Sequence, residues 1–199
     1  MNYQKATFLL SVANLHQLPP DAGVEIAIIG RSNAGKSSVL NQLTKNNSLA
    51  RVSKTPGRTQ HINLFGLDEK HRIADLPGYG YAKVPPNMKK HWQTLINTYL
   101  YERQCLHGLI LVMDIRHPLK DFDLQMLEWA NASELAVHIL LNKSDKLTPN
   151  QQRKTLSLVS EAISEYGTPF SVQLFSAVKG QGLDELKSAL APWWKKSAS

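Results

Sequence analysis

Eight residues in the first quarter of the chain match the pattern G-x-x-x-x-G-K-[ST], which is typical of loops that bind phosphate. They are Gly30, Arg31, Ser32, Asn33, Ala34, Gly35, Lys36 and Ser37. Glycines let the backbone wrap closely around an anion, and N–H groups of the loop and the next helix then point at phosphate oxygens. Lys36 would reach the β- and γ-phosphates, and the Ser37 hydroxyl would bind Mg²⁺. Because a mostly apolar run at 24–29 precedes the pattern, we interpret it as a nucleotide-binding loop.

A second motif indicates which base the nucleotide carries. Asn142, Lys143, Ser144 and Asp145 follow the apolar run 136–141, and ligands bind at the carboxyl ends of strands in open α/β sheets. The Asp145 carboxylate could accept both hydrogens of guanine N1 and N2, a donor pair that adenine lacks. We expect Asn142 to tie this segment to the phosphate loop and Lys143 to cover the base and ribose. Alone, N-K-x-D would be a polar turn before a helix.

Between these motifs lie Asp75, Leu76, Pro77 and Gly78. Asp75 ends an expected strand and could hold Mg²⁺ through water, and the backbone N–H of Gly78 could contact a γ-phosphate. On its own the tetrapeptide would be an ordinary Pro-Gly turn, so its meaning depends on the two other motifs.

The three motifs, in this order, resemble those of the TRAFAC-class GTPases, and longer strings are similar to the EngB family of bacterial ribosome-biogenesis GTPases. The matching strings are GRSNAGKS at 30–37, SKTPGRTQ at 53–60, DLPGYGYA at 75–82 and MDIRHPLK at 113–120. The resemblance covers nearly the whole chain. It implies GTP hydrolysis, a role in assembling the large ribosomal subunit and a link to normal septation.

The resemblance also extends the site. Either Thr55 or Thr59 could bind Mg²⁺, and the family pattern places the ligand on Thr59. The residues assigned to the nucleotide site with it are Gly57, Arg58, Gln60 and His61. In this class a loop after the last strand caps the base, and its backbone N–H groups could donate to guanine O6. Here that loop is Phe175, Ser176 and Ala177.

Phosphoryl transfer requires charge neutralisation and a positioned water, for which we assign Lys36, Thr59 and Gly78 with Mg²⁺. Many relatives carry glutamine directly after this glycine, whereas here the residue is Tyr79. A phenol cannot reproduce the paired donor and acceptor of an amide, so we expect slow intrinsic turnover that a partner raises. In related GTPases the phosphate-loop asparagine that corresponds to Asn33 helps to bind K⁺ beside the phosphates. Alternatively, Asn33 only shapes the loop.

Three other classes fit these residues less well. A P-loop kinase would not need N-K-x-D, and a dinucleotide-binding enzyme needs a glycine where Ser32 stands. An RNA-binding module without enzymatic activity would explain the charge but not three ordered motifs. Binding of GDP and GTP but not ATP would separate these possibilities.

The chain has 199 residues and a net charge of +7. No acidic residue occurs between 26 and 67, so the basic residues there could meet a triphosphate or an RNA backbone, unless they only form a solvated surface. The resemblance favours ribosomal RNA, contacted through phosphates and shape, and we expect no DNA partner.

The chain has a single cysteine, Cys105, which suits a protein of the reducing cytoplasm. We expect Cys105 to be a small buried residue. We predict no membrane span or signal peptide; a monomer is expected, although the oligomeric state is left open.

Apolar runs alternate with helical patterns, which predicts a three-layer P-loop NTPase fold of the Ras-like kind. We expect a six-stranded, mostly parallel sheet with one antiparallel strand, in a single G domain over 1–199 whose core is 22–195 after an extension at 1–20. The expected strands are 24–30, 61–67, 70–75, 108–114, 136–142 and 170–175, and the helices 36–46, 87–103, 120–132, 149–166 and 182–195. The close pair 61–67 and 70–75 should form a hairpin. Loops 46–60 and 76–87 should be switches that a γ-phosphate orders.

Overall fold

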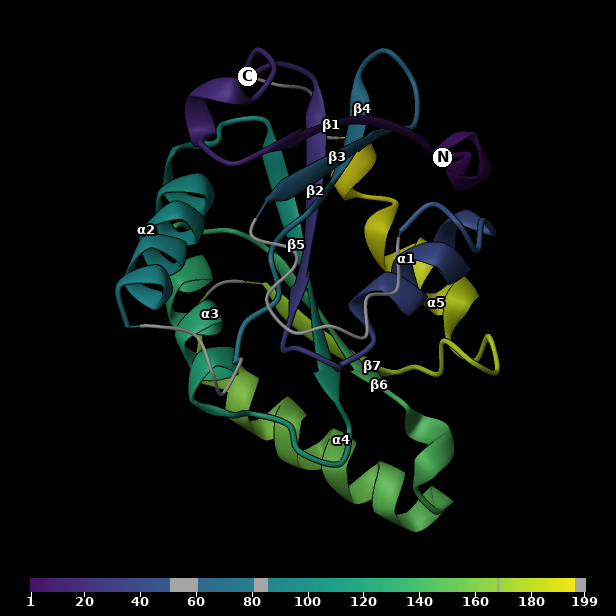
Figure 1. The fold of residues 1–199 in the computed structure, drawn as a ribbon. Helices are drawn as coiled ribbons and strands as arrows, with labels where there is room; N and C mark the ends of the chain where they lie inside the picture. The colour runs from purple at the N-terminus through teal and green to yellow at the C-terminus, as the bar shows by residue number, and fades with distance from the viewer. Residues whose placement is uncertain (51–60, 81–85, 168, 196–199) are drawn as a thin grey trace.

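The computed structural model describes residues 1–50, 61–80, 86–167 and 169–195, which form an α/β fold around one twisted sheet (Figure 1). Within this part the sheet has seven strands, in the order β1-β3-β4-β2-β5-β6-β7. The strands are β1 (Thr7–Val12), β2 (Val24–Gly30), β3 (Ile62–Gly66), β4 (His71–Asp75), β5 (Leu106–Asp114), β6 (Val137–Asn142) and β7 (Phe170–Leu174).

The prediction of six strands was wrong by one, because β1 lies in the segment that we expected to be only an extension. Its sequence, TFLLSV, does not alternate between polar and apolar residues, and a bulge between Phe8 and Leu10 breaks its register. It pairs antiparallel with β3, which pairs antiparallel with β4 as the predicted hairpin. All other pairings are parallel, so β3 is the one strand that runs against the rest, as predicted.

Helices cover both faces of the sheet, with α2, α3 and α4 on one side and α1 and α5 on the other (Figure 1). Their bounds are α1 (Lys36–Thr44), α2 (Pro86–Glu102), α3 (Asp121–Ala132), α4 (Pro149–Ser164) and α5 (Leu183–Leu190). Each begins within one residue of the position predicted from the sequence. The predicted helix 182–195 was too long: α5 ends at Leu190, because Pro192 lacks the N–H that a helix needs, and a 3₁₀ turn follows.

The core consists of two apolar layers, one on each face of the sheet. Along β5, Leu109, Leu111 and Met113 pack in the layer below α2, α3 and α4, whereas Ile110 and Val112 pack below α1 and α5. This alternation follows from the two-residue period of a strand. The two apolar layers together support the edge of the sheet from which the loops with the motifs begin.

The C-terminal tryptophans belong to this core and are 8% and 7% exposed at Trp193 and Trp194. Trp194 Nε1 donates to the Tyr3 hydroxyl at 2.8 Å, which joins the two ends of the described chain. Cys105 is also buried. In the described part of the chain, every helix is too short or too polar to cross a bilayer.

Candidate nucleotide-binding site

Four loops carrying the predicted site residues follow the carboxyl ends of β2, β4, β6 and β7. These strands are parallel, so the loops that follow them come to the same edge of the sheet. The edge therefore brings together phosphate-binding, base-binding and metal-binding candidates that are far apart in sequence.

The phosphate loop between β2 and α1 has two residues in the left-handed region. Gly35 has φ of 97° and Asn33 has φ of 64°. A Cβ at Gly35 would lie 2.3 Å from Nδ2 of Asn142, so this position has no space for a side chain. Asparagine tolerates the left-handed region better than most residues, which fits the alternative that Asn33 shapes the loop. The K⁺ role of Asn33 stays a prediction.

Asn142 joins three of these loops through its side chain. Its Nδ2 donates to the carbonyl oxygen of Ala34 at 2.8 Å, and its Oδ1 accepts from the backbone N–H of Ala177 at 3.1 Å. Asn142 is 2% exposed, so both bonds lie in a site with little access to water. This is the predicted link between the phosphate loop at 30–37 and the segment 142–145, which we call the base loop.

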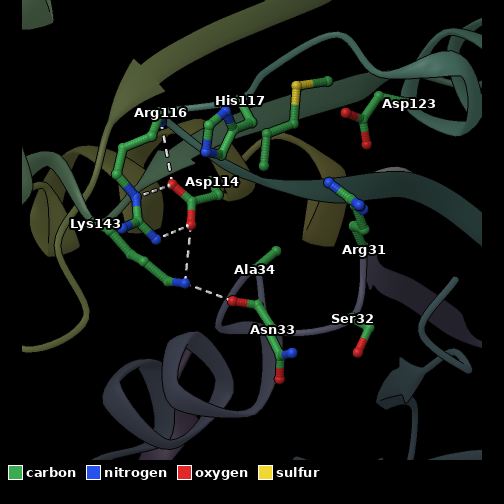
Figure 2. A pocket seen from close by; sticks show the side chains of 10 residues that line it. Arg31, Ser32, Asn33, Ala34, Asp114, Arg116, His117, Asp123 and Lys143 are labelled. Atoms are coloured by element: carbon green, nitrogen blue, oxygen red, sulfur yellow. Dashed lines mark hydrogen bonds and ion pairs between the residues drawn. The ribbon is translucent and has the colours of Figure 1, made fainter. Parts of the chain in front are cut away.

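Lys143 lies over the phosphate loop, and its ammonium group is paired with the Asp114 carboxylate. Its Nζ donates to the carbonyl oxygen of Asn33 at 2.5 Å and to Oδ2 of Asp114 at 2.9 Å, as Figure 2 shows. Arg116 donates to the same carboxylate at 2.9 and 2.7 Å. Burial favours a higher pKa of Asp114, but hydrogen bonds from Arg116 and Lys143 outweigh it and hold that pKa well below its usual range.

Asp145 is bound by the loop after β7. Ser176 Oγ donates to its Oδ1 at 2.6 Å, and Lys146 Nζ lies 3.4 Å from its Oδ2. The hydrogen bond from Ser176 lowers the pKa of the Asp145 carboxyl, so the group is an ionised acceptor at neutral pH. An ionised carboxylate held in place is the group that recognition of guanine N1 and N2 requires.

The backbone N–H groups at 175–177, which we expected to donate to guanine O6, already have acceptors within the protein. The backbone N–H groups of Phe175, Ser176 and Ala177 donate to Leu141 O, Gln181 O and Asn142 Oδ1, respectively. A base acceptor would therefore have to share or replace one of these acceptors. Sequence reasoning did not anticipate this, because it depends on contacts between separate loops.

Lys36 and Asp75 contact each other through Nζ and Oδ1, and both side chains are largely buried. Asp75 is opposite Ile28 in the parallel register of β4 and β2, which brings it beside the phosphate loop. Ser37 lies in the first turn of α1. Hydroxyl and carboxylate oxygens are ligands that Mg²⁺ accepts, so the donors present fit this ion.

Gly78 is followed by a residue that pairs with the phosphate loop. Tyr79 O accepts from Ser32 N at 2.7 Å, and Tyr79 N donates to Gly30 O at 3.3 Å. The Tyr79 phenol donates to Oδ1 of Asp123 on α3. Burial, together with the Asp123 carboxylate, raises the pKa of Tyr79 well above its usual value, so the phenol stays protonated.

Four of the predicted residues, Gly57, Arg58, Thr59 and Gln60, lie outside the described residues, as do 81–85 of the second expected switch. His61 is exposed just before β3. The assignment of Thr59 to Mg²⁺ therefore stays a prediction.

A polar pocket of about 240 Å³ lies beside the phosphate loop (Figure 2). Its lining includes the phosphate-loop residues 31–34, Asp114, Arg116, Asp123 and Lys143. Sequence reasoning assigned no role to Asp114, Arg116 or Asp123. Two of them stand in the family-like string 113–120, which was the available signal.

Comparison with known proteins decides the family. A family model described as "50S ribosome-binding GTPase" matches residues 25–143. A curated "Probable GTP-binding protein EngB" of Coxiella burnetii (strain RSA 493 / Nine Mile phase I) is 56% identical over 193 residues, covering 97% of this chain and 94% of the relative. The chain belongs to the EngB family. An EngB protein of Escherichia coli O9:H4 (strain HS) is 51% identical over 98% of this chain and 93% of its own length.

Solved structures share the fold of this chain. A crystal structure of a probable GTP-binding protein EngB has a TM-score of 0.71 at 21% identity, covering 86% of this chain and 99% of that one. Elongation factor SelB of Methanococcus maripaludis, in complex with a GTP analogue, has a TM-score of 0.60 at 18% identity, over 88% of this chain and 34% of that one. The protein is a GTPase with the P-loop fold; the kinase, dehydrogenase and non-enzymatic alternatives are thereby excluded.

Proposed function

We propose that this EngB-family GTPase is a cytoplasmic, monomeric switch that acts on the large ribosomal subunit or its precursor, and that it supports septation through ribosome supply. The observation that carries the proposal is the joining of base loop and phosphate loop by Asn142, with Asp145 held as an ionised acceptor beside them. The family description, which names 50S ribosome binding, supports the choice of partner.

In this proposal, Ser37, Thr59 and, through water, Asp75 would hold Mg²⁺. When bound, Mg²⁺ supplies charge neutralisation at the β- and γ-phosphates. Lys36 would release Asp75 and contact the phosphates, because a triphosphate offers it more negative charge than a single carboxylate. Nucleotide binding would thus exchange one buried ion pair for several.

The residue that stands where many relatives carry glutamine does not supply a group for activating water. Tyr79 is 2% exposed and donates to Asp123, so its phenol is not directed at an attacking water. We therefore propose slow intrinsic hydrolysis that depends on Lys36, the N–H of Gly78 and a partner. Binding of K⁺ by the Asn33 side chain would add charge beside the phosphates; equal hydrolysis rates in potassium and sodium buffers would exclude that role.

The partner surface in this proposal is basic and reads phosphates rather than bases. Arg31 and Lys45 are exposed near the two ends of the segment formed by the phosphate loop and α1. The net charge of +7 favours association with RNA at moderate salt.

Two measurements test the proposal. GDP and GTP should bind at about micromolar concentration or below, and ATP should not compete. In sedimentation with ribosomal particles, binding should require a non-hydrolysable GTP analogue and should weaken as salt rises. Equal competition by ATP would exclude the assigned role of Asp145, and binding that ignores salt and nucleotide would exclude a switched, phosphate-contacting surface.

A further inference from the structure

Tyr79 connects the phosphate loop to helix α3. Its backbone pairs with the loop as a short parallel bridge to Arg31, with Ser32 N donating to Tyr79 O at 2.7 Å. Its hydroxyl donates to Asp123, which stands 44 residues later in the sequence. One residue directly after Gly78 is thus fixed at its main chain by β2 and the phosphate loop, and at its side chain by α3.

Gly78 is held between two such anchors. Before it, Leu76 N donates to Ile28 O at 2.9 Å, and after it Tyr79 N donates to Gly30 O at 3.3 Å. Both acceptors belong to β2, the strand that leads into the phosphate loop. The backbone of Gly78 is therefore placed relative to the loop, and Tyr79 is one of the two points that place it.

Asp123 is suited to hold this tyrosine still. It is 1% exposed, and its second oxygen, Oδ2, accepts from Lys120 N at 2.9 Å at the start of α3. Because each carboxylate oxygen has its own donor, rotation of the group would break a hydrogen bond. The ring of Tyr79 also packs beside Trp92 of α2 and Phe122 of α3, at centroid distances of 5.9 and 5.7 Å.

We propose that Asp123 is a positioning residue for GTP hydrolysis, which acts through Tyr79 to keep the Gly78 backbone in register with the phosphate loop. The proposal rests on the proposed contact between Gly78 N–H and the γ-phosphate. GDP has no γ-phosphate and makes no such contact. Loss of the Tyr79–Asp123 bond should therefore weaken the GTP state and leave the GDP state nearly unchanged, whereas a purely structural defect would weaken both.

The test compares Y79F, D123N and the double variant in the full chain. Y79F removes only the hydroxyl and keeps the ring packing, so it remains informative if D123N fails to fold through loss of the α3 cap. Matched controls are Y101F, because Tyr101 is 71% exposed, and D121N, because Asp121 is exposed in the same helical turn. Affinities for GDP and a non-hydrolysable GTP analogue, and kcat for GTP, are measured for each.

We expect the analogue affinity and kcat to fall about tenfold in Y79F and D123N, with GDP affinity changed less than about twofold. The analogue affinity and kcat of the double variant should be no lower than those of the more impaired single variant, because both changes remove the same bond. Unchanged ratios of analogue to GDP affinity together with unchanged kcat, or equal losses for both nucleotides, would overturn the inference. If wild type binds ATP as well as GTP, the proposed function fails instead; if wild type is guanine-specific and the variants match it, only this inference fails.

Discussion

The side-chain amide of Asn142 donates to the carbonyl oxygen of Ala34 at 2.8 Å, although the two residues are 108 positions apart. The bond joins the loop expected to read the base to the loop expected to hold the phosphates. Both partners are buried, so water cannot replace the bond without entering the site. We therefore expect nucleotide affinity to depend on Asn142 even if its side chain makes no contact with the nucleotide.

Asn142→Ala removes this bond and the one to Ala177 N, and leaves buried groups unpaired. Loss of about 1–3 kcal/mol, or roughly five- to 150-fold in affinity for GDP and GTP alike, is expected. Equilibrium binding of a fluorescent GDP measures it. Asn150→Ala, at an exposed position in the first turn of α4, is the control and should bind as wild type does. Normal GDP affinity in the Asn142 variant would contradict the linking role.

Asp145→Asn should change which base is bound. The carboxylate can accept the N1 and N2 hydrogens of guanine, whereas an amide can also donate to the C2 oxygen of xanthine. We expect GDP affinity to fall by about a hundredfold or more and xanthosine diphosphate binding to improve. Competition binding with both nucleotides measures the change. Asp184→Asn, whose side chain is 98% exposed, should alter neither affinity.

Gly108→Ala should destabilise the fold without touching the site. A Cβ there would lie 2.3 Å from Cε3 of Trp193, so the buried indole must move. The expected loss is about 1–3 kcal/mol in the free energy of unfolding, measured in urea. Gly167→Ala is the matched control, since, apart from its chain neighbours, no atom of the described residues lies within 4 Å of a Cβ at that position. Equal stability of the two variants would show that Trp193 yields at no cost.

Stability should fall in mild acid because of His138. Burial lowers the pKa of this imidazole from its ordinary 6.5, and its ring nitrogens lie 2.8 Å from Ser171 Oγ and Gln173 Oε1. Below pH 6.5 the unfolded chain binds this proton while the folded chain does not. The contribution of His138 is thus complete above 6.5 and is lost as pH falls through the lowered pKa of the folded state.

Urea unfolding of wild type and His138→Gln between pH 7.5 and 5 measures this contribution. The slope of unfolding free energy against pH should be smaller in the variant, because the variant lacks the titrating group. His16→Gln, at an exposed position, should keep the wild-type slope. The same slope in all three proteins would assign the acid sensitivity to other groups.

Local sequence patterns accounted for most of the fold. Apolar periodicity predicted six of the seven strands and all five α-helices of the described residues. At the start of α4, the structure adds a cap: the Thr148 side chain accepts from Gln151 N. Strand β1 was missed because its exposed edge position leaves Phe8 and Leu9 without the alternating pattern of a half-buried strand. Pairing with β3, rather than a pattern in its own residues, makes β1 part of the sheet.

The sequence by itself determined the chemistry of the site: a phosphate loop, an acidic residue for the base and the order of the motifs that mark the family. Those properties depend on residue type and short spacing, which are local. Only the tertiary structure decided that Tyr79 is held by Asp123, that Lys143 is held by Asp114, and that the N–H groups at 175–177 already have acceptors. Such pairings depend on how neighbouring strands align their ends, and no pattern within one segment specifies that alignment.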